Sequence, residues 1–121
     1  MGSDSRQAAV HLVNQIAQII FDKKGANILG LDVRGLSVFA DYVIIAEGSA
    51  DRHVVAISEA IIKALSEEGK KPLYVEGLST GDWVVIDFLD VVVHLFMPGL
   101  REKYHLESLW QEAEIVDLEL C

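Results

Sequence analysis

Residues 42–46 read Tyr-Val-Ile-Ile-Ala, and this stretch decides the fold. A continuous apolar run rich in β-branched side chains is typical of a strand that is buried on both faces of a sheet. Residues 48–51, Gly-Ser-Ala-Asp, end the run. Apolar residues then recur at three- and four-residue steps, at Val54, Ile57, Ile61 and Leu65. This spacing predicts a helix from Arg52 to Glu68, with Ser49 or Asp51 as N-cap and Gly69 just after its end.

The segments before and after this strand and helix also alternate between predicted helices and strands. Upstream, apolar residues at helical spacing predict a helix over 4–24, and a strand over 28–33 follows it. Downstream, we predict strands over 73–75, 83–88 and 91–96 and a third helix over 101–111. The connection between the last two strands is so short that they must form an antiparallel hairpin. We therefore expect one α/β domain, in which a mixed sheet of about five strands carries flanking helices.

The charge of the chain is strongly acidic and unevenly spread. Nineteen Asp and Glu oppose ten Lys and Arg, a net charge of -9. Residues 1–71 hold nine acids and eight bases, a balance of -1, whereas residues 72–121 hold ten acids and two bases, a balance of -8. Such a surface repels phosphate backbones, so direct nucleic-acid binding is disfavoured. Acids also simply keep small domains in solution, but a one-sided field favours a basic protein as partner.

Several kinds of site lack their sequence signals. Cys121 is the single cysteine, so neither a disulfide framework nor a cysteine-based zinc cluster can form. No apolar stretch approaches the roughly 18 residues of a membrane span, and the first residues lack the features of a targeting segment. The histidines and glycines are too dispersed for a helical metal site or a phosphate-binding loop. We expect a cytoplasmic protein with no metal, no cofactor and no membrane contact.

Scattered aspartates leave one catalytic alternative open. A small nucleotidyltransferase-like enzyme would use Asp32, Asp41 and Asp87 with Mg²⁺ and ATP. Two-metal phosphoryl transfer needs carboxylates that converge on ions about 4 Å apart, most simply as Asp-x-Asp on one strand. The sequence contains no such pair. We therefore expect no enzymatic activity and interpret Asp82, Asp87 and Asp90 as turn and cap residues.

The C-terminal part gathers large apolar side chains within its acidic stretch. They are Trp83, Tyr104, Leu106 and Trp110. Aromatic side chains ringed by charge have the composition of binding hot spots. For Tyr104 and Trp110, core packing and a binding role both stay open, because intermediate burial is typical of these residue types. His94 should point to the opposite face of its strand from Val93 and Leu95, partly buried and hydrogen-bonded.

Taken together, the motifs of this chain resemble the ribosomal silencing factor family, also called RsfS or Iojap. The resemblance covers about residues 8–110. It depends on the order and spacing of short motifs: Asp41-Tyr42-Val43-Ile44-Ile45, Gly48-Ser49, Arg52-His53-Val54, Glu76-Gly77, Asp82-Trp83, Asp87, Asp90-Val91-Val92-Val93-His94 and Arg101-x-x-Tyr104-x-Leu106-Glu107-x-Leu109-Trp110. The resemblance implies a nucleotidyltransferase-like topology without the catalytic residues.

The resemblance also implies a function. A member of this family would bind ribosomal protein fourteen of the large ribosomal subunit and sterically block joining of the small subunit, repressing translation under nutrient limitation. It would form a homodimer when free. The resemblance and the charge asymmetry together predict apolar anchors and polar or acidic contacts: Trp83, Tyr104, Leu106 and Trp110 as anchors, with Asp82, Asp90, His94 and Glu107 as the contacts. A generic acidic dimerisation module stays as a third interpretation.

The resemblance predicts three parts along the chain. Residues 1–7 would be disordered or cloning-derived, residues 8–110 would form the ribosomal silencing factor domain, and residues 111–121 would be an acidic C-terminal tail. This tail extends past the usual end of the family, and it would either add to the acidic surface or stay unattached. Glu47 stands where we expect a small polar residue in the family.

Overall fold

The structure of the chain is a computed structural model that describes residues 2–104, 108 and 110–121. Its elements, in chain order, are α1 (Gly2–Asp22), β1 (Ala26–Asp32), β2 (Tyr42–Glu47), α2 (Asp51–Glu67), β3 (Tyr74–Glu76), β4 (Trp83–Asp87), β5 (Val91–Phe96), α3 (Leu100–Tyr104) and β6 (Glu114–Ile115). The strands form one sheet in the order β3-β4-β5-β2-β1-β6. Among the strand pairs of the described residues, the central β2–β5 pair is the parallel one, and the other pairs are antiparallel. The predicted α/β domain with a mixed sheet is confirmed, with six strands in place of about five.

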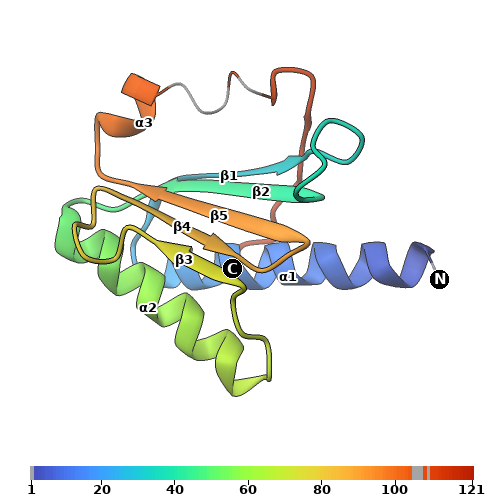
Figure 1. Ribbon diagram of the computed structural model, residues 1–121, viewed down its shortest axis with the longest axis horizontal. Helices are drawn as coiled ribbons and strands as arrows, with labels where there is room; N and C mark the ends of the chain where they lie inside the picture. The colour runs from blue at the N-terminus through green and yellow to red at the C-terminus, as the bar shows by residue number, and fades with distance from the viewer. Residues whose placement is uncertain (1, 105–107, 109) are drawn as a thin grey trace.

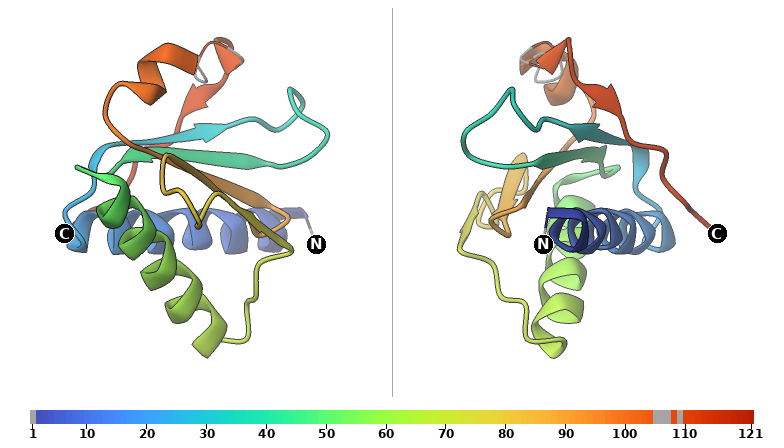
Figure 2. Two further views of the ribbon diagram at one scale, coloured as in Figure 1. Left: turned by 60° about the vertical axis from the view of Figure 1, so that its left-hand side comes forward. Right: turned by 90° about the vertical axis from the view of Figure 1, so that its right-hand side faces the viewer.

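The two long helices cover the same face of the sheet (Figures 1 and 2). Both predicted apolar stripes are buried against it: Ala9, Val13, Ile16 and Ile20 of α1, and Val54, Ile57, Ile61 and Leu65 of α2. Burial of one such aliphatic side chain stabilises the fold by roughly 1.5–3 kcal/mol. α3 lies on the opposite face of the sheet (Figure 1).

The Tyr42–Ala46 stretch contributes to the core on both faces, as predicted. Tyr42, Ile44 and Ala46 pack in the large core under α1 and α2. Val43 and Ile45 point the other way into a smaller apolar cluster on the opposite face. β2 therefore lies at the centre of the molecule, with β5 parallel on one side and β1 antiparallel on the other.

Helix boundaries differ from the sequence predictions in three places. α1 begins at Gly2 and so includes residues 2–7, for which we predicted disorder or a cloning origin. α2 has Ala50 as N-cap without a side-chain hydrogen bond, so the prediction of Ser49 or Asp51 in that role is wrong. Instead, the backbone N–H of Ser49 donates to Nδ1 of His53, 2.8 Å away. None of the helices in the described ranges is long and apolar enough to cross a membrane.

α3 spans Leu100–Tyr104 and lies at the start of the helix that we predicted over 101–111. Residues 105–107 and 109 of that prediction lie outside the described residues. A five-residue segment has too few turns to be stable as an isolated helix. Leu100 and Trp110 pack against the smaller apolar cluster, so both lie next to the strands.

The C-terminal tail is attached along β1 and α1. β6 pairs antiparallel with β1, and the N–H of Val116 donates to the carbonyl of Gly30 at 2.8 Å. Val116 and Leu118 then pack against the large core. Gly30 makes this approach possible, since a Cβ there would lie 3.1 Å from Leu118 and 3.3 Å from Val116. Of the two outcomes that the sequence left open, the structure shows a docked tail.

Candidate functional site

The face of the sheet opposite α1 and α2 carries a group of aromatic rings that we name the aromatic cluster: Trp83, His94, Phe96, Tyr104 and Trp110. Side chains alternate between the two faces of a strand. Val93 and Leu95 are fully buried under the helices, so His94 and Phe96 point to the other face, as predicted for His94. Trp83 lies directly opposite Phe96 in the β4–β5 pair.

The rings of the aromatic cluster touch one another in a continuous series. The ring centroid of Trp83 lies 5.0 Å from that of Phe96 and 5.1 Å from that of Tyr104. The centroids of His94 and Trp110 are 6.5 Å apart. All three distances fall in the 4.5–7 Å range in which aromatic pairs attract each other. The sheet and the chain after β5 therefore share one packed aromatic surface.

The exposed fraction of the rings differs within the aromatic cluster, from Phe96 at its floor to Tyr104 at its rim. Phe96 is fully buried, Trp83, His94 and Trp110 are partly buried, and Tyr104 is 50% exposed. Tyr104 therefore lies at the surface and not in the core, and its binding role stays a prediction. Trp110 packs against the smaller apolar cluster but keeps part of its ring in contact with solvent. Hot spots of protein interfaces are enriched in Trp and Tyr and lie in well-packed regions, which makes these rings candidates for a contact.

His94 is neutral within the aromatic cluster at physiological pH. The indole N–H of Trp83 donates to Nδ1 of His94 at 3.1 Å, so this nitrogen acts as an acceptor. Burial lowers the pKa of His94 from 6.5 to about 4, because the surrounding apolar groups disfavour the imidazolium. The bond fixes the orientation of the Trp83 ring, on which Tyr104 packs.

A partly buried ion pair connects α3 to the sheet. The guanidinium of Arg101 donates to Oε2 of Glu47 at 3.2 Å and also to the backbone carbonyl of Asn27. Asn27 in turn donates through its amide to the same Glu47 oxygen at 3.0 Å. The side chains of Arg101 and Glu47 are only 11% and 17% exposed. Glu47, the residue that departs from the expected pattern, therefore holds the helix that carries Tyr104.

The acidic residues predicted for this surface do not all lie there. Asp82 is exposed next to Trp83, and its carbonyl accepts the N–H of Met97 at 3.0 Å. Asp90 precedes β5, six residues before Phe96, which corresponds to roughly 20 Å of strand. The structure therefore keeps Asp90 away from the aromatic cluster. Two other predicted contacts, Leu106 and Glu107, lie outside the described residues.

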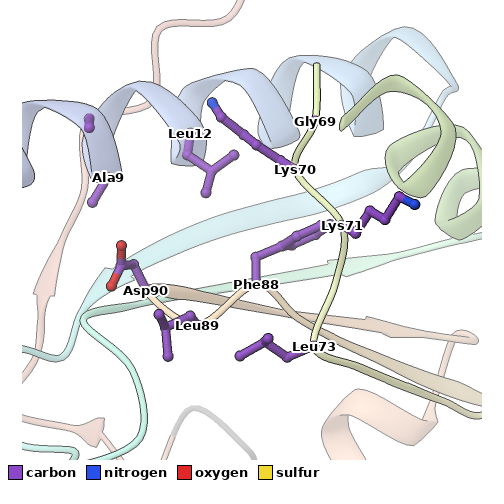
Figure 3. A pocket seen from close by; sticks show the side chains of 10 residues that line it. Ala9, Leu12, Gly69, Lys70, Lys71, Leu73, Phe88, Leu89 and Asp90 are labelled. Carbon is purple, nitrogen blue, oxygen red and sulfur yellow. The ribbon is translucent and has the colours of Figure 1, made fainter. Parts of the chain in front are cut away.

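Asp90 instead lines a cavity on the helical side of the sheet. This cavity of about 370 Å³ lies between α1, the segment after α2 and the β4–β5 turn. In Figure 3, Asp90 reaches toward Ala9 and Leu12 of α1, and Phe88 points toward the segment that carries Lys71. The lining is mostly apolar. This cavity is separated from the aromatic cluster by the sheet itself.

The aspartates of the enzymatic alternative have structural partners. Asp32 makes a two-pronged contact with Arg34, at 2.9 Å and 2.6 Å. The carboxylate of Asp87 accepts the N–H of Leu89 at 2.7 Å, which confirms its predicted role in the turn. Asp41 is placed by backbone bonding to the Asp90 carbonyl, 3.0 Å away. Within the described residues, no group of three His, Cys, Asp or Glu side chains is arranged to hold a metal ion.

Comparison with known proteins identifies the family. A family model described as "Ribosomal silencing factor during starvation" matches residues 6–120. The chain belongs to the ribosomal silencing factor family. The ribosomal silencing factor RsfS of Bacillus subtilis is 41% identical over 98 residues, which cover 81% of this chain and 83% of that protein. The matched region includes residues 111–120, which the sequence analysis placed beyond the usual end of the family.

Two further relatives show how far the likeness extends. A crystal structure of a protein from Chromobacterium violaceum superimposes with a TM-score of 0.79 at 33% identity, covering 84% of this chain and 86% of that one. A mouse protein named "Mitochondrial assembly of ribosomal large subunit protein 1" is 28% identical over 101 residues, which cover 81% of this chain and 44% of that protein. The fold of this silencing factor is thus shared with solved family members.

Sequence reasoning missed part of the open face of this silencing factor. Phe96 forms the floor of the aromatic cluster, and the alternation that placed His94 also predicts Phe96 on the same face. The open face also includes Tyr74 of the edge strand β3. Tyr74 pairs with Asp87 of β4 and is 52% exposed. Its hydroxyl donates to Glu76, and this bond raises the pKa of Tyr74. Register between strands carries no local sequence signal.

Proposed function

We propose that this ribosomal silencing factor binds ribosomal protein fourteen of the large subunit through the aromatic cluster, and that its bulk then blocks joining of the small subunit. The family name supports a ribosome-associated silencing role. The name of the mouse relative connects that protein with the large subunit. The observation that carries the choice of surface is Tyr104, which is half exposed although its ring packs on Trp83 at 5.1 Å.

The aromatic cluster has the features that a tight contact needs. Its rings are held in place before binding, by the Trp83–His94 hydrogen bond and by the Glu47–Arg101 pair. Preorganised side chains lose little conformational entropy when a partner binds. Truncation of an aromatic hot-spot residue in an interface costs about 2 kcal/mol or more of binding free energy.

The negative charge near the aromatic cluster is complementary to the charge of a basic partner. Asp82 and Glu102 are exposed beside Trp83 and Tyr104, in the half of the chain that carries a balance of -8. Complementary charge raises the association rate more than the affinity, and salt weakens the effect. We therefore expect the acids to speed capture of a basic ribosomal protein, while the aromatic rings determine how long it stays bound.

The proposed action involves no chemical step. A silencing factor of this kind occupies a surface that another subunit must approach, so affinity and bulk are sufficient. A standard protein interface buries about 800 Å² on each partner. Translation would fall under nutrient limitation because free large subunits are withdrawn from the joining reaction.

Sedimentation with isolated subunits tests this proposal. The purified chain is centrifuged through a sucrose gradient with large or small subunits of Bacillus subtilis, and joining of the two subunits is then measured with and without it. We expect the chain to move with large subunits only and to reduce the joined fraction in proportion to its occupancy. Binding to neither subunit, or binding without an effect on joining, would refute the proposal.

We also propose that the free chain is a cytoplasmic homodimer. The basis is the family resemblance of the sequence together with the partly exposed aromatic rings, which a second copy would cover. Size-exclusion chromatography with light scattering should give twice the mass of one chain. A monomer at micromolar concentration would contradict this part of the proposal and leave ribosome binding unaffected.

A further inference from the structure

The loop between β1 and β2, residues 33–41, presents a second exposed apolar feature. Val38 is 92% exposed and Phe39 is 82% exposed, the highest values for large apolar side chains among the described residues. Leu36 in the same loop is 45% exposed. Single exposed apolar residues are common, but adjacent ones gathered on one loop indicate a contact site. The loop lies at the end of the sheet away from α3 (Figures 1 and 2).

The loop is held in one conformation by its own hydrogen bonds. The N–H of Val33 donates to the Asp41 carbonyl at 2.9 Å and closes the base of the loop. The N–H groups of Leu36 and Ser37 both donate to the Val33 carbonyl, at 2.9 Å and 3.0 Å. The hydroxyl of Ser37 accepts the N–H of Phe39 at 3.1 Å. The apolar tip is therefore presented outward before any partner arrives, which lowers the entropy cost of binding.

An acidic hollow lies beside this loop. The hollow has a volume of about 380 Å³ and is lined by Asp32, Arg34, Leu36, Glu112 and Glu114. Asp32 is already paired with Arg34. No ion pair involving Glu112 or Glu114 is found within the described ranges, and both are exposed. The hollow therefore has two carboxylates available for a cation.

Strand pairing concentrates this negative charge. The docked tail places Glu114 directly opposite Asp32 in the β1–β6 pair. Like charges in directly opposed positions repel each other. A cation from a partner near Glu112 and Glu114 would lower this repulsion. The same charge repels RNA phosphates, so a protein fits this site better than RNA does.

We propose that the tip of the β1–β2 loop and the acidic hollow form a second docking point for a basic protein segment. A Lys or Arg side chain of that segment enters the hollow between Glu112 and Glu114, and a neighbouring apolar side chain packs on Val38 and Phe39. The inference rests on the proposed function, because the segment belongs to a protein of the large subunit. Two docking points at opposite ends of the sheet would prevent the bound chain from rotating, which a steric block requires.

Photocrosslinking identifies what touches the loop. Val38 is replaced by p-benzoylphenylalanine, the chain is bound to Bacillus subtilis large subunits, and crosslinked peptides are identified by mass spectrometry. We expect crosslinks to a Lys- and Arg-rich segment of a ribosomal protein. Crosslinks only to ribosomal RNA or to a second copy of this chain, or none from sedimenting complexes, would overturn the proposal. Leu73, which is 68% exposed at another edge, serves as the control position.

Affinity measurements separate the loop from the aromatic cluster. We expect the double variant Val38→Ser/Phe39→Ser, and separately Glu112→Gln/Glu114→Gln, to bind large subunits about tenfold more weakly than the natural chain. Leu73→Ser should bind unchanged. If the natural chain binds and both double variants bind equally well, the loop proposal alone is wrong. If the natural chain does not bind, the proposed function fails together with it.

Discussion

His94 offers a quantitative test of how the aromatic cluster is packed. In the folded chain, burial holds the pKa of His94 at about 4, against 6.5 for an exposed histidine. The indole of Trp83 donates to Nδ1 of His94, and this bond requires a nitrogen that carries no proton. The protein therefore folds with a neutral His94, whereas the unfolded chain takes up a proton at this side chain below pH 6.5.

The difference between the folded-state and unfolded-state pKa of His94 determines how the stability of the protein changes with pH. Because the folded-state pKa is the lower one, acid favours the unfolded state, which binds the additional proton. The stability contributed by neutral His94 is fully present above pH 6.5 and is lost as the pH falls toward 4. Linkage predicts a loss of about 2 kcal/mol between pH 7 and pH 5, and roughly 3 kcal/mol below pH 4.

Urea unfolding of the natural chain and of His94→Gln measures this loss. Glutamine can still accept the Trp83 hydrogen bond but does not titrate, and all other titrating groups are common to both proteins. The natural chain should lose about 2 kcal/mol more than His94→Gln between pH 7 and pH 5. Equal losses, or an NMR titration that gives His94 a pKa of 6 or above, would refute the packing described here.

Three further changes test other parts of the structure by urea or thermal unfolding. Glu47→Ala should lower the free energy of unfolding by about 2 kcal/mol, because it takes the carboxylate from a partly buried pair. Glu68→Ala, whose pair with Lys70 is half exposed, should cost under about 0.5 kcal/mol. Equal costs would contradict the role of Glu47. Gly77→Ala should lower the free energy of unfolding by at least about 3 kcal/mol, since its Cβ would lie 2.0 Å from the Trp83 carbonyl oxygen. Gly99→Ala, at a similar φ but in open space, should lower it by about 1 kcal/mol. Similar unfolding midpoints for the two variants would show that Gly77 is not constrained. Deletion of residues 111–121 should lower the free energy of unfolding by about 3 kcal/mol, because Val116 and Leu118 no longer pack against the core. An unchanged unfolding midpoint would argue against a docked tail.

Periodicity predicted the parts of the fold that depend on local patterns. The apolar run at 42–46 gave the central strand, and the stripes at three- and four-residue steps gave both long helices. Alternation in β5 placed His94 on the open face correctly. These predictions hold because burial of one face or one stripe is a property of each segment by itself.

Features that depend on distant contacts were not predictable in the same way. β6 is a two-residue strand that exists because the tail meets β1 at Gly30, about 85 positions earlier in the sequence, and nothing local marks it. Trp110 packs against the smaller apolar cluster of the sheet, a contact that helical spacing does not reveal. The resemblance and the charge asymmetry predict Asp90 as a contact, but strand direction places it at the end of β5 away from Phe96, where it lines the cavity on the helical side.

The affinity of Tyr104→Ala for large ribosomal subunits tests the central claim most directly. Phe21→Ala is the matched control, because Phe21 is 46% exposed and belongs to α1, the helix that covers the sheet face opposite the aromatic cluster. With both variants confirmed as folded, Tyr104→Ala should bind about 30-fold more weakly, mainly through faster dissociation, and Phe21→Ala should bind like the natural chain. Unchanged binding by Tyr104→Ala, or an equal loss in both variants, would contradict the account.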